Sequence, residues 1–132
     1  MAITSLMSCN DNTSGACNVS GKQAEALAAR FLEQQGLQIV ARNVHCRGGE
    51  IDLVCRDGKT LVFVEVRLRR NAGFGGAAAS ITRHKQQRVI LAARHYLATQ
   101  ACANSDCRFD CVLLADLNVN SIEWIRDAFA VD

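Results

Sequence analysis

Three acidic residues and a neighbouring arginine fall on two segments that the sequence predicts to be paired strands. Glu50 and Asp52 lie in G-G-E-I-D-L-V, and Glu65 and Arg67 lie in V-F-V-E-V-R-L. The segments are separated by R-D-G-K at positions 56–59, and an Asp-Gly pair supplies the positive φ angles of a type I′ hairpin. Two carboxylates opposite one another destabilise a sheet unless something offsets their charge.

Counting outward from Asp57 and Gly58 as the two central residues gives the expected register. It pairs Cys55 with Thr60, Asp52 with Phe63, and Glu50 with Glu65, which leaves Asp52 and Glu65 on a diagonal. Because side chains alternate along a strand, we expect one acidic face and one hydrophobic wall. The acidic face would carry Glu50, Asp52, Phe63, Glu65 and Arg67, and the wall Ile51, Leu53, Val62, Val64, Val66 and Leu68.

Two interpretations of the acidic face remain open from spacing alone. It is either the solvated polar side of a half-exposed hairpin or a site for a divalent cation. Mg²⁺ binds proteins through one or two carboxylates and keeps several waters, which suits a phosphate substrate.

The composition indicates one globular domain of 132 residues, with 49% hydrophobic and 21% charged residues. The first twenty residues contain no Lys or Arg, and we expect residues 1–19 to be a flexible tail before a single domain over 20–132. The net charge is only +2, but basic residues are concentrated in the middle of the chain. This distribution suits a phosphate-bearing partner, although an ordinary solvated surface would also explain it.

The cysteine pattern and the start of the chain indicate the compartment. The seven cysteines are odd in number and include no C-x-x-C pair. The first residues show neither the basic start nor the apolar run of a signal peptide. No stretch approaches the roughly 20 apolar residues of a membrane span. We therefore expect reduced thiols, a cytoplasmic location and no membrane association.

A helix is predicted from about Ser20 to Gln35, ended by Gly36, with a buried stripe of Ala24, Leu27, Ala28, Phe31 and Leu32. Glu25 lies at the edge of that stripe. It is either a solvated glutamate of the first turns or a third carboxylate that leans towards the acidic face. A strand over 37–44, ended by Arg42-Asn43, would then pair with the hairpin.

A second helix is predicted from Ser80 or Thr82 to Thr99, buried through Val89, Ala92, Ala93, Tyr96 and Leu97. Its basic first turns, which include Lys85 and Gln86, suit phosphate contact, and a solvated basic face is equally compatible. Strands over 108–117 and 121–125 follow, with a tail from Asp127. Asp110 needs a partner if it is buried, and adjacency argues against Arg108 in that role. The order α-β-β-β-α-β-β predicts an α/β fold with a mixed sheet between helices.

Taken in order, G-K-Q-A-E-A-L-A, G-E-I-D-L, V-F-V-E-V-R-L-R, a basic helix and R-F-D resemble the YraN family of predicted endonuclease-like bacterial proteins. The resemblance covers about residues 20–129. That family in turn is similar to the restriction-endonuclease-like PD-(D/E)XK nucleases, and in the order of its elements to archaeal Holliday-junction resolvases.

The resemblance implies a restriction-endonuclease-like fold and a metal-dependent endonuclease that hydrolyses phosphodiester bonds in DNA, including branched or damaged DNA. It implies that Asp52 and Glu65, completed by Glu25, bind Mg²⁺ or Mn²⁺. Arg67 stands where the superfamily has a lysine that orients or activates water, and an arginine can grip a phosphate but cannot act as a base. The expected DNA contacts are Arg42, Arg69, Arg70, Lys85 and Gln86, and a junction-cutting enzyme is expected to be a homodimer. The alternative is a nucleic-acid-binding or scaffold module of the same fold with weak or no cleavage.

Overall fold

The protein is described by a computed structural model that covers residues 16–68, 81–100 and 105–131. Its elements in chain order are α2 (Ala16–Gln34), β1 (Gln38–Cys46), β2 (Gly49–Asp57), β3 (Thr60–Leu68), α3 (Arg83–Thr99), β4 (Asp106–Leu114), the short helix η3 (Val119–Ser121) and β5 (Ile122–Phe129). The order confirms the predicted α/β fold. Within these residues, no helix is both long and apolar enough to cross a membrane.

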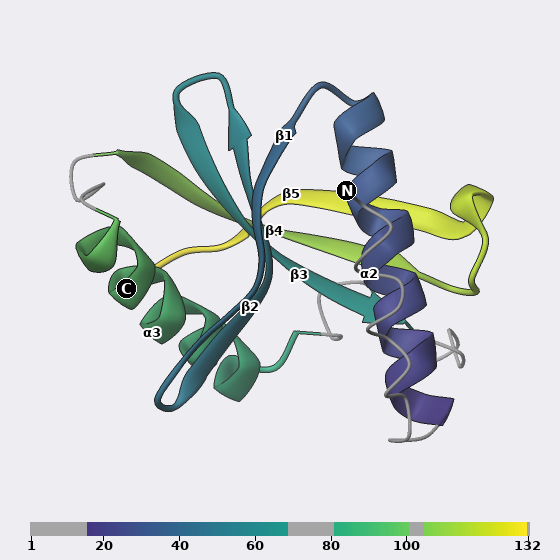
Figure 1. The fold of residues 1–132 in the computed structure, drawn as a ribbon, viewed down its shortest axis with the longest axis horizontal. Helices are drawn as coiled ribbons and strands as arrows, with labels where there is room; N and C mark the ends of the chain where they lie inside the picture. The colour runs from purple at the N-terminus through teal and green to yellow at the C-terminus, as the bar shows by residue number, and fades with distance from the viewer. Residues whose placement is uncertain (1–15, 69–80, 101–104, 132) are drawn as a thin grey trace.

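The sheet has the strand order β1-β2-β3-β4-β5. Neighbouring strands are antiparallel except β3 and β4, which are parallel and are joined in sequence through α3. Figure 1 shows the strands crossing between α2 and α3, which lie on opposite sides of the sheet. A parallel pair requires such a crossover, and the intervening helix then covers one face.

Each face of the sheet has its own hydrophobic core. The α3 side is centred on Phe63, which packs against the rings of Tyr96 and Phe109 at centroid distances of 6.1 and 5.6 Å. The α2 side buries Val62 and Val64 against the small residues of α2, which include Ala28. Burial on both faces explains why β3 has a nearly continuous apolar run, which Glu65 and Arg67 interrupt near its end.

The end of α2 follows the predicted signal. Gly36 has φ +99°, the N–H of Leu37 donates to Leu32 O at 3.0 Å, and the N–H of Gly36 donates to Glu33 O at 3.0 Å. These two bonds form a Schellman motif, which needs a residue with positive φ at this position. The start differs from the prediction, because α2 begins at Ala16 rather than near Ser20. Residues 1–15 of the predicted tail lie outside the described residues.

The start of α3 is also as predicted. Thr82 is the N-cap, and its hydroxyl oxygen accepts the N–H of Lys85 at 3.1 Å. Four of the five residues predicted to be buried on this helix are buried, and the fifth, Leu97, packs partly buried against the same core. The capping bond fixes the first turn of α3 and therefore the place of Lys85.

The predicted register of the β2–β3 hairpin is wrong by two residues. Asp57 pairs with Thr60 and Leu53 pairs with Val64, so Gly58 and Lys59 are the central residues of the turn. Gly58 has φ +64° and Lys59 has no positive φ, as in a type II′ turn, where glycine takes the first central position. A shift of two residues leaves the side chains of β3 on the predicted faces. It moves Asp52 level with Glu65 instead of Phe63.

The boundaries of β1, β4 and β5 differ from the prediction. β1 continues through Asn43 to Cys46, and β4 covers 106–114 rather than 108–117. β5 continues to Phe129, in the predicted tail, and Phe129 stacks on Phe109 at 5.0 Å. Asp127 has φ +53° opposite an irregularity in β4, and this kink interrupts the alternation by which the strand would have been recognised.

Asp110 is fully buried, and the expectation that Arg108 could not be its partner is wrong. Arg108 Nε donates to both carboxylate oxygens at 3.0 and 3.2 Å. Residues i and i+2 of a strand share a face, so near neighbours in sequence can pair in this way. Trp124 Nε1 and the N–H of Asp127 also donate to Asp110, each at 2.9 Å. This aspartate joins β4 to β5.

Candidate metal and phosphate site

The acidic residues lie where β2 and β3 separate. The paired register of the two strands ends at Leu53 and Val64, although both strands continue beyond it. At the next position Asp52 Oδ2 accepts the N–H of Val66 at 2.8 Å, so a bond to a side chain replaces the backbone hydrogen bond between the two strands. Figure 1 shows the result: the start of β2 lies beside α3, and the end of β3 passes behind α2.

The alternation of side chains breaks at Asp52. Ile51 packs into the core under α3, whereas Leu53 packs into the core under α2. Strict alternation would place residues 51 and 53 on one face, so the expectation that Ile51 belongs to the wall with Leu53 is wrong. Asp52 therefore occupies the turning point of β2, between the two faces of the sheet.

Glu65 is the buried member of the acidic group, with only 2% of its surface exposed. Its Oε2 lies 2.9 Å from Lys85 Nζ, which comes from the first turn of α3. Burial raises the pKa of Glu65 to about 7, and repulsion from Asp52 adds to the shift, whereas the hydrogen bond and charge of Lys85 oppose it. The lysine compensates only part of the cost of burying this carboxylate.

Burial also raises the pKa of Asp52 to about 6, with the charge of Glu25 contributing and the Val66 N–H opposing. The pKa of Glu25 is raised by burial too, and hydrogen bonds with Asp52 and Asn43 lower it. The three acids from α2, β2 and β3 therefore lie close enough for each to influence the pKa of another.

This group is not arranged as a finished metal site. Among the described residues, no three His, Cys, Asp or Glu side chains are placed to hold one ion together. Glu65 is paired with Lys85, and Asp52 is bonded to the Val66 N–H. The donors are all hard carboxylate oxygens, the class that Mg²⁺ and Mn²⁺ prefer.

A close backbone contact sets the distance between Lys85 and the acids. A Cβ added to Gly49 would lie 2.5 Å from Arg88 O and 3.0 Å from Ala92 N, both in the backbone of α3. Only a glycine allows β2 to approach the helix this closely. The second glycine of G-G-E-I-D thus brings α3, and Lys85 with it, onto the sheet.

Of the other residues predicted for the site, Arg67 lies near the three acids, whereas Glu50 and Gln86 have other partners. Arg67 is half-buried on β3, and its charge opposes the rise that burial causes in the pKa of Glu65. Glu50 lies 3.5 Å from His45 Nε2 and 3.8 Å from Arg88, in a separate, half-exposed cluster. Gln86 Nε2 donates to Ile81 O at 3.2 Å, just ahead of the start of α3.

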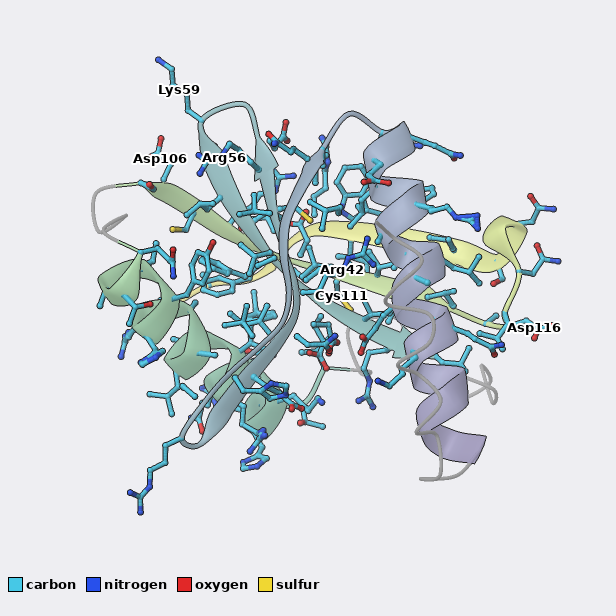
Figure 2. The ribbon with its side chains drawn as sticks, viewed as in Figure 1. Arg42, Arg56, Lys59, Asp106, Cys111 and Asp116 are labelled. Atoms are coloured by element: carbon cyan, nitrogen blue, oxygen red, sulfur yellow. The ribbon has the colours of Figure 1, made fainter. Side chains whose placement is uncertain are left out.

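The predicted DNA-contacting arginines are distributed unevenly. Arg42 is exposed on β1, and Figure 2 shows it near the middle of the sheet, away from Arg56 and Lys59 at the tip of the β2–β3 hairpin. Arg69 and Arg70 lie outside the described residues.

Two features of the group were not predicted from the sequence. Lys85 was expected to contact phosphates of the ligand, and the structure places it on Glu65. Asn43 was expected only to end a strand, and it lies inside β1 with a φ of +51°. An asparagine inside a β-prone run is a signal that was available, because asparagine tolerates the left-handed backbone region. The pairing of Lys85 has no local signal, since it depends on how α3 packs.

The sequence is similar to a defined protein family. The model of "Uncharacterised protein family UPF0102" matches residues 24–114. A UPF0102 protein of Dechloromonas aromatica is 54% identical over 123 residues, which cover 93% of this chain and 95% of that relative. The "UPF0102 protein YraN" of Salmonella arizonae is 52% identical over 115 residues, which cover 86% of each chain. The matched region contains Glu25, Asp52, Glu65 and Lys85.

Proposed function

The chain belongs to the uncharacterised protein family UPF0102, and from its acidic site we propose that it is a metal-dependent endonuclease acting on DNA. The observation that carries the proposal is the meeting of Glu25, Asp52 and Glu65 from three separate elements. Buried carboxylates that raise one another's pKa are costly for folding, and such clusters are concentrated at functional sites. The restriction-endonuclease-like relationship is part of the same proposal.

Mg²⁺ or Mn²⁺ fits the donor chemistry of the group. Asp52 and Glu65 would hold the ion, with Glu25 completing the ligand set, and the positive charge would relieve the repulsion among them. When bound, the ion would lower the pKa of a coordinated water and stabilise the charge that develops on the phosphate. Binding would require Glu65 to share its carboxylate between the ion and Lys85.

In the nuclease superfamily that this chain resembles, a lysine two residues after the glutamate supplies an ammonium group. We infer that Lys85 supplies it in this protein. Here that position is Arg67, but Lys85 Nζ reaches Glu65 from α3 at 2.9 Å. An ammonium can orient a water molecule by donating to it, and it titrates more readily than a guanidinium. Arg67, beside the same glutamate, is suited to hold the scissile phosphate through two parallel hydrogen bonds.

The remaining contacts would be made to the DNA backbone. Arg42, Arg69, Arg70 and the exposed side of the first turns of α3 would bind flanking phosphates, a mode that is independent of sequence and weakens steeply with salt. Cleavage of a branched substrate on two strands would require a homodimer with two sites. Sedimentation of the protein with and without junction DNA would measure this state.

The experiment that tests the proposal is nicking of supercoiled plasmid and of a four-way junction with Mg²⁺ or Mn²⁺. We expect wild-type cleavage that EDTA abolishes and that Asp52→Asn and Glu65→Gln each reduce at least 10²-fold. Lys59→Gln, at the hairpin tip, is the control and should cleave normally. Cleavage that both acidic-site substitutions leave unchanged would contradict the proposal.

A second candidate function is a DNA-binding or scaffold module without efficient cleavage. The Lys85–Glu65 ion pair favours it, because the lysine already occupies a carboxylate that a metal would need. Salt-sensitive DNA binding by a wild-type protein that never nicks DNA would support this candidate over the nuclease.

A further inference from the structure

The turn between β1 and β2 carries an exposed arginine without an acidic partner. The two strands stay paired as far as Cys46 and Gly49, so Arg47 and Gly48 form a two-residue turn, and both are exposed. Among the described residues, no carboxylate forms an ion pair with the Arg47 guanidinium. The positive charge at this turn is therefore available to an anionic partner.

Three consecutive residues fix the turn against α3. A Cβ added to Gly48 would lie 3.2 Å from Leu91 Cδ2, and one added to Gly49 would lie 2.5 Å from the backbone of the helix. Next in sequence, Glu50 Oε2 lies 3.8 Å from Arg88 Nη2. Figure 1 shows this turn beside α3, at the end of the sheet opposite the β2–β3 turn. The helix thus holds the backbone of the turn in one place.

The surface around the turn is cationic. Glu50 is the only acidic residue within 44–50 and 83–94, and its carboxylate lies 3.5 Å from His45 Nε2 as well as 3.8 Å from Arg88. One carboxylate shared between two basic side chains leaves the surface positive. The same two segments contain five Lys and Arg residues, which are Arg47, Arg83, Lys85, Arg88 and Arg94.

The turn and the acidic site lie along the same two elements. Glu50 precedes Asp52 by two residues on β2, and Arg88 follows Lys85 by about one turn of α3. Because a strand rises about 3.3 Å per residue, Arg47 lies roughly 15 Å from Asp52. Each strand of duplex DNA has a phosphate about every 3.4 Å along the axis, so this distance corresponds to about four or five nucleotides. A duplex with one phosphate at the acidic site can therefore reach the turn.

We propose that the β1–β2 turn is a phosphate-binding contact for DNA, made by the Arg47 guanidinium. The inference rests on the proposed function for the identity of its partner, but it does not depend on cleavage. A guanidinium matches a phosphate through two parallel hydrogen bonds, and a fixed backbone reduces the entropy lost on binding. The contact is made to the DNA backbone and carries no sequence preference. It directs the duplex from the acidic site towards the β1–β2 turn and away from the β2–β3 turn.

The test compares Arg47→Gln with Lys59→Gln. Lys59 is the matched control, because it is also an exposed cation beside a glycine in a two-residue hairpin turn, at the other end of the sheet. Fluorescence anisotropy measures binding of a labelled mixed-sequence duplex in EDTA over a series of salt concentrations. Without a divalent cation, cleavage cannot contribute to the signal.

For Arg47→Gln we expect the plot of log affinity against log salt to lose about one unit of slope, which is about a tenfold loss of affinity at about 0.1 M salt. Lys59→Gln should leave both the slope and the affinity as in the wild type. Arg47→Lys keeps the charge and should therefore keep the slope, with a smaller loss of affinity because an ammonium cannot bind the phosphate through a planar pair of donors.

The outcomes distinguish this contact from the proposed function. A salt slope that Arg47→Gln leaves unchanged would overturn the contact, and so would equal losses in Arg47→Gln and Lys59→Gln, because the cause would then be the loss of any surface charge. A slope that Arg47→Lys fails to keep would also contradict it. Binding that depends on Arg47 in a protein that never nicks DNA would support the contact and overturn the nuclease proposal. A wild-type protein that binds no DNA would overturn both.

Discussion

Lys85 Nζ lies 2.9 Å from Glu65 Oε2, although the two residues are twenty positions apart and come from a helix and a strand. The glutamate is almost completely buried and the lysine about one quarter exposed. An ion pair that is buried on one side stabilises the fold only if its geometry is good, and removal of one partner leaves a costly charge. The pair therefore influences both the stability of the site and its capacity for a cation.

Replacement of Lys85 should separate catalysis from metal binding. Lys85→Gln removes the ammonium that orients water and also frees Glu65 for an ion. We expect nicking to fall about 10²-fold, the usual range for a group that assists proton transfer. Mn²⁺ affinity measured by calorimetry should stay the same or increase. A parallel loss of Mn²⁺ affinity would show that Lys85 acts by holding Glu65 in place.

Substitution of Asp52 should change the pH dependence of stability. The folded-state pKa of Asp52, about 6, is above the ordinary value of 3.8, so the folded protein holds this proton more tightly than the unfolded chain does. Relative to Asp52→Asn, the metal-free wild type should therefore lose stability as the pH rises from about 4 to about 6.

The difference between the two proteins at pH 8 should be about 1–3 kcal/mol in favour of Asp52→Asn, after allowance for the partial exposure of the site. Urea denaturation at a series of pH values measures it. Addition of Mn²⁺ should remove the difference by stabilising the wild type alone. A wild type that is more stable than the variant at pH 8 without metal would contradict the assignment of Asp52.

Gly49→Ala should destabilise the protein by forcing β2 and α3 apart. The added Cβ would meet two backbone atoms of the helix, which cannot rotate out of the way. We expect a loss of about 1–3 kcal/mol, typical of overpacking, together with weaker nicking because Lys85 moves with α3. Gly21→Ala is the control. Gly21 lies on α2, and a Cβ added there would have no atom within 4 Å, so this variant should stabilise the helix by about 0.5–1 kcal/mol.

Asp110 should respond differently from Asp52, although both are aspartates near the centre of the sheet. Asp110 accepts from Arg108, Trp124 and the Asp127 N–H, so its charge is fully compensated. Asp110→Asn replaces one acceptor oxygen by an amide NH₂ that faces donors, and Arg108 keeps its second partner Asp57 at 3.0 Å, so the variant should lose about 1–3 kcal/mol. Thermal unfolding measures this loss. Mn²⁺ affinity of the folded fraction should be unchanged, and a large drop in it would place Asp110 in the metal site.

The elements of the fold could be predicted because their signals are local. Gly36 and Thr82 mark helix ends by their own backbone and side-chain chemistry, and α2 and α3 have apolar stripes of helical period. β5 was only half predicted, since the kink at Asp127 hides the link between Trp124 and the buried Phe129.

The site could be predicted only as far as its residue types allow. Asp52 and Glu65 were associated through their places on neighbouring strands, yet the turn at Gly58 set a register two residues away from the expected one. Both turn types accept glycine, so the sequence does not distinguish them. The contact of Lys85 with Glu65 arises from packing between elements that are distant in sequence, and no periodicity encodes it.

Calorimetric titration of Mn²⁺ at pH 8 tests most directly whether the acidic residues share a cation. We predict saturable binding to the wild-type protein, abolished by Asp52→Asn and by Glu65→Gln and retained by Asp110→Asn and Lys59→Gln. A wild-type protein that takes up no Mn²⁺, or binding that survives both acidic-site substitutions, would contradict it.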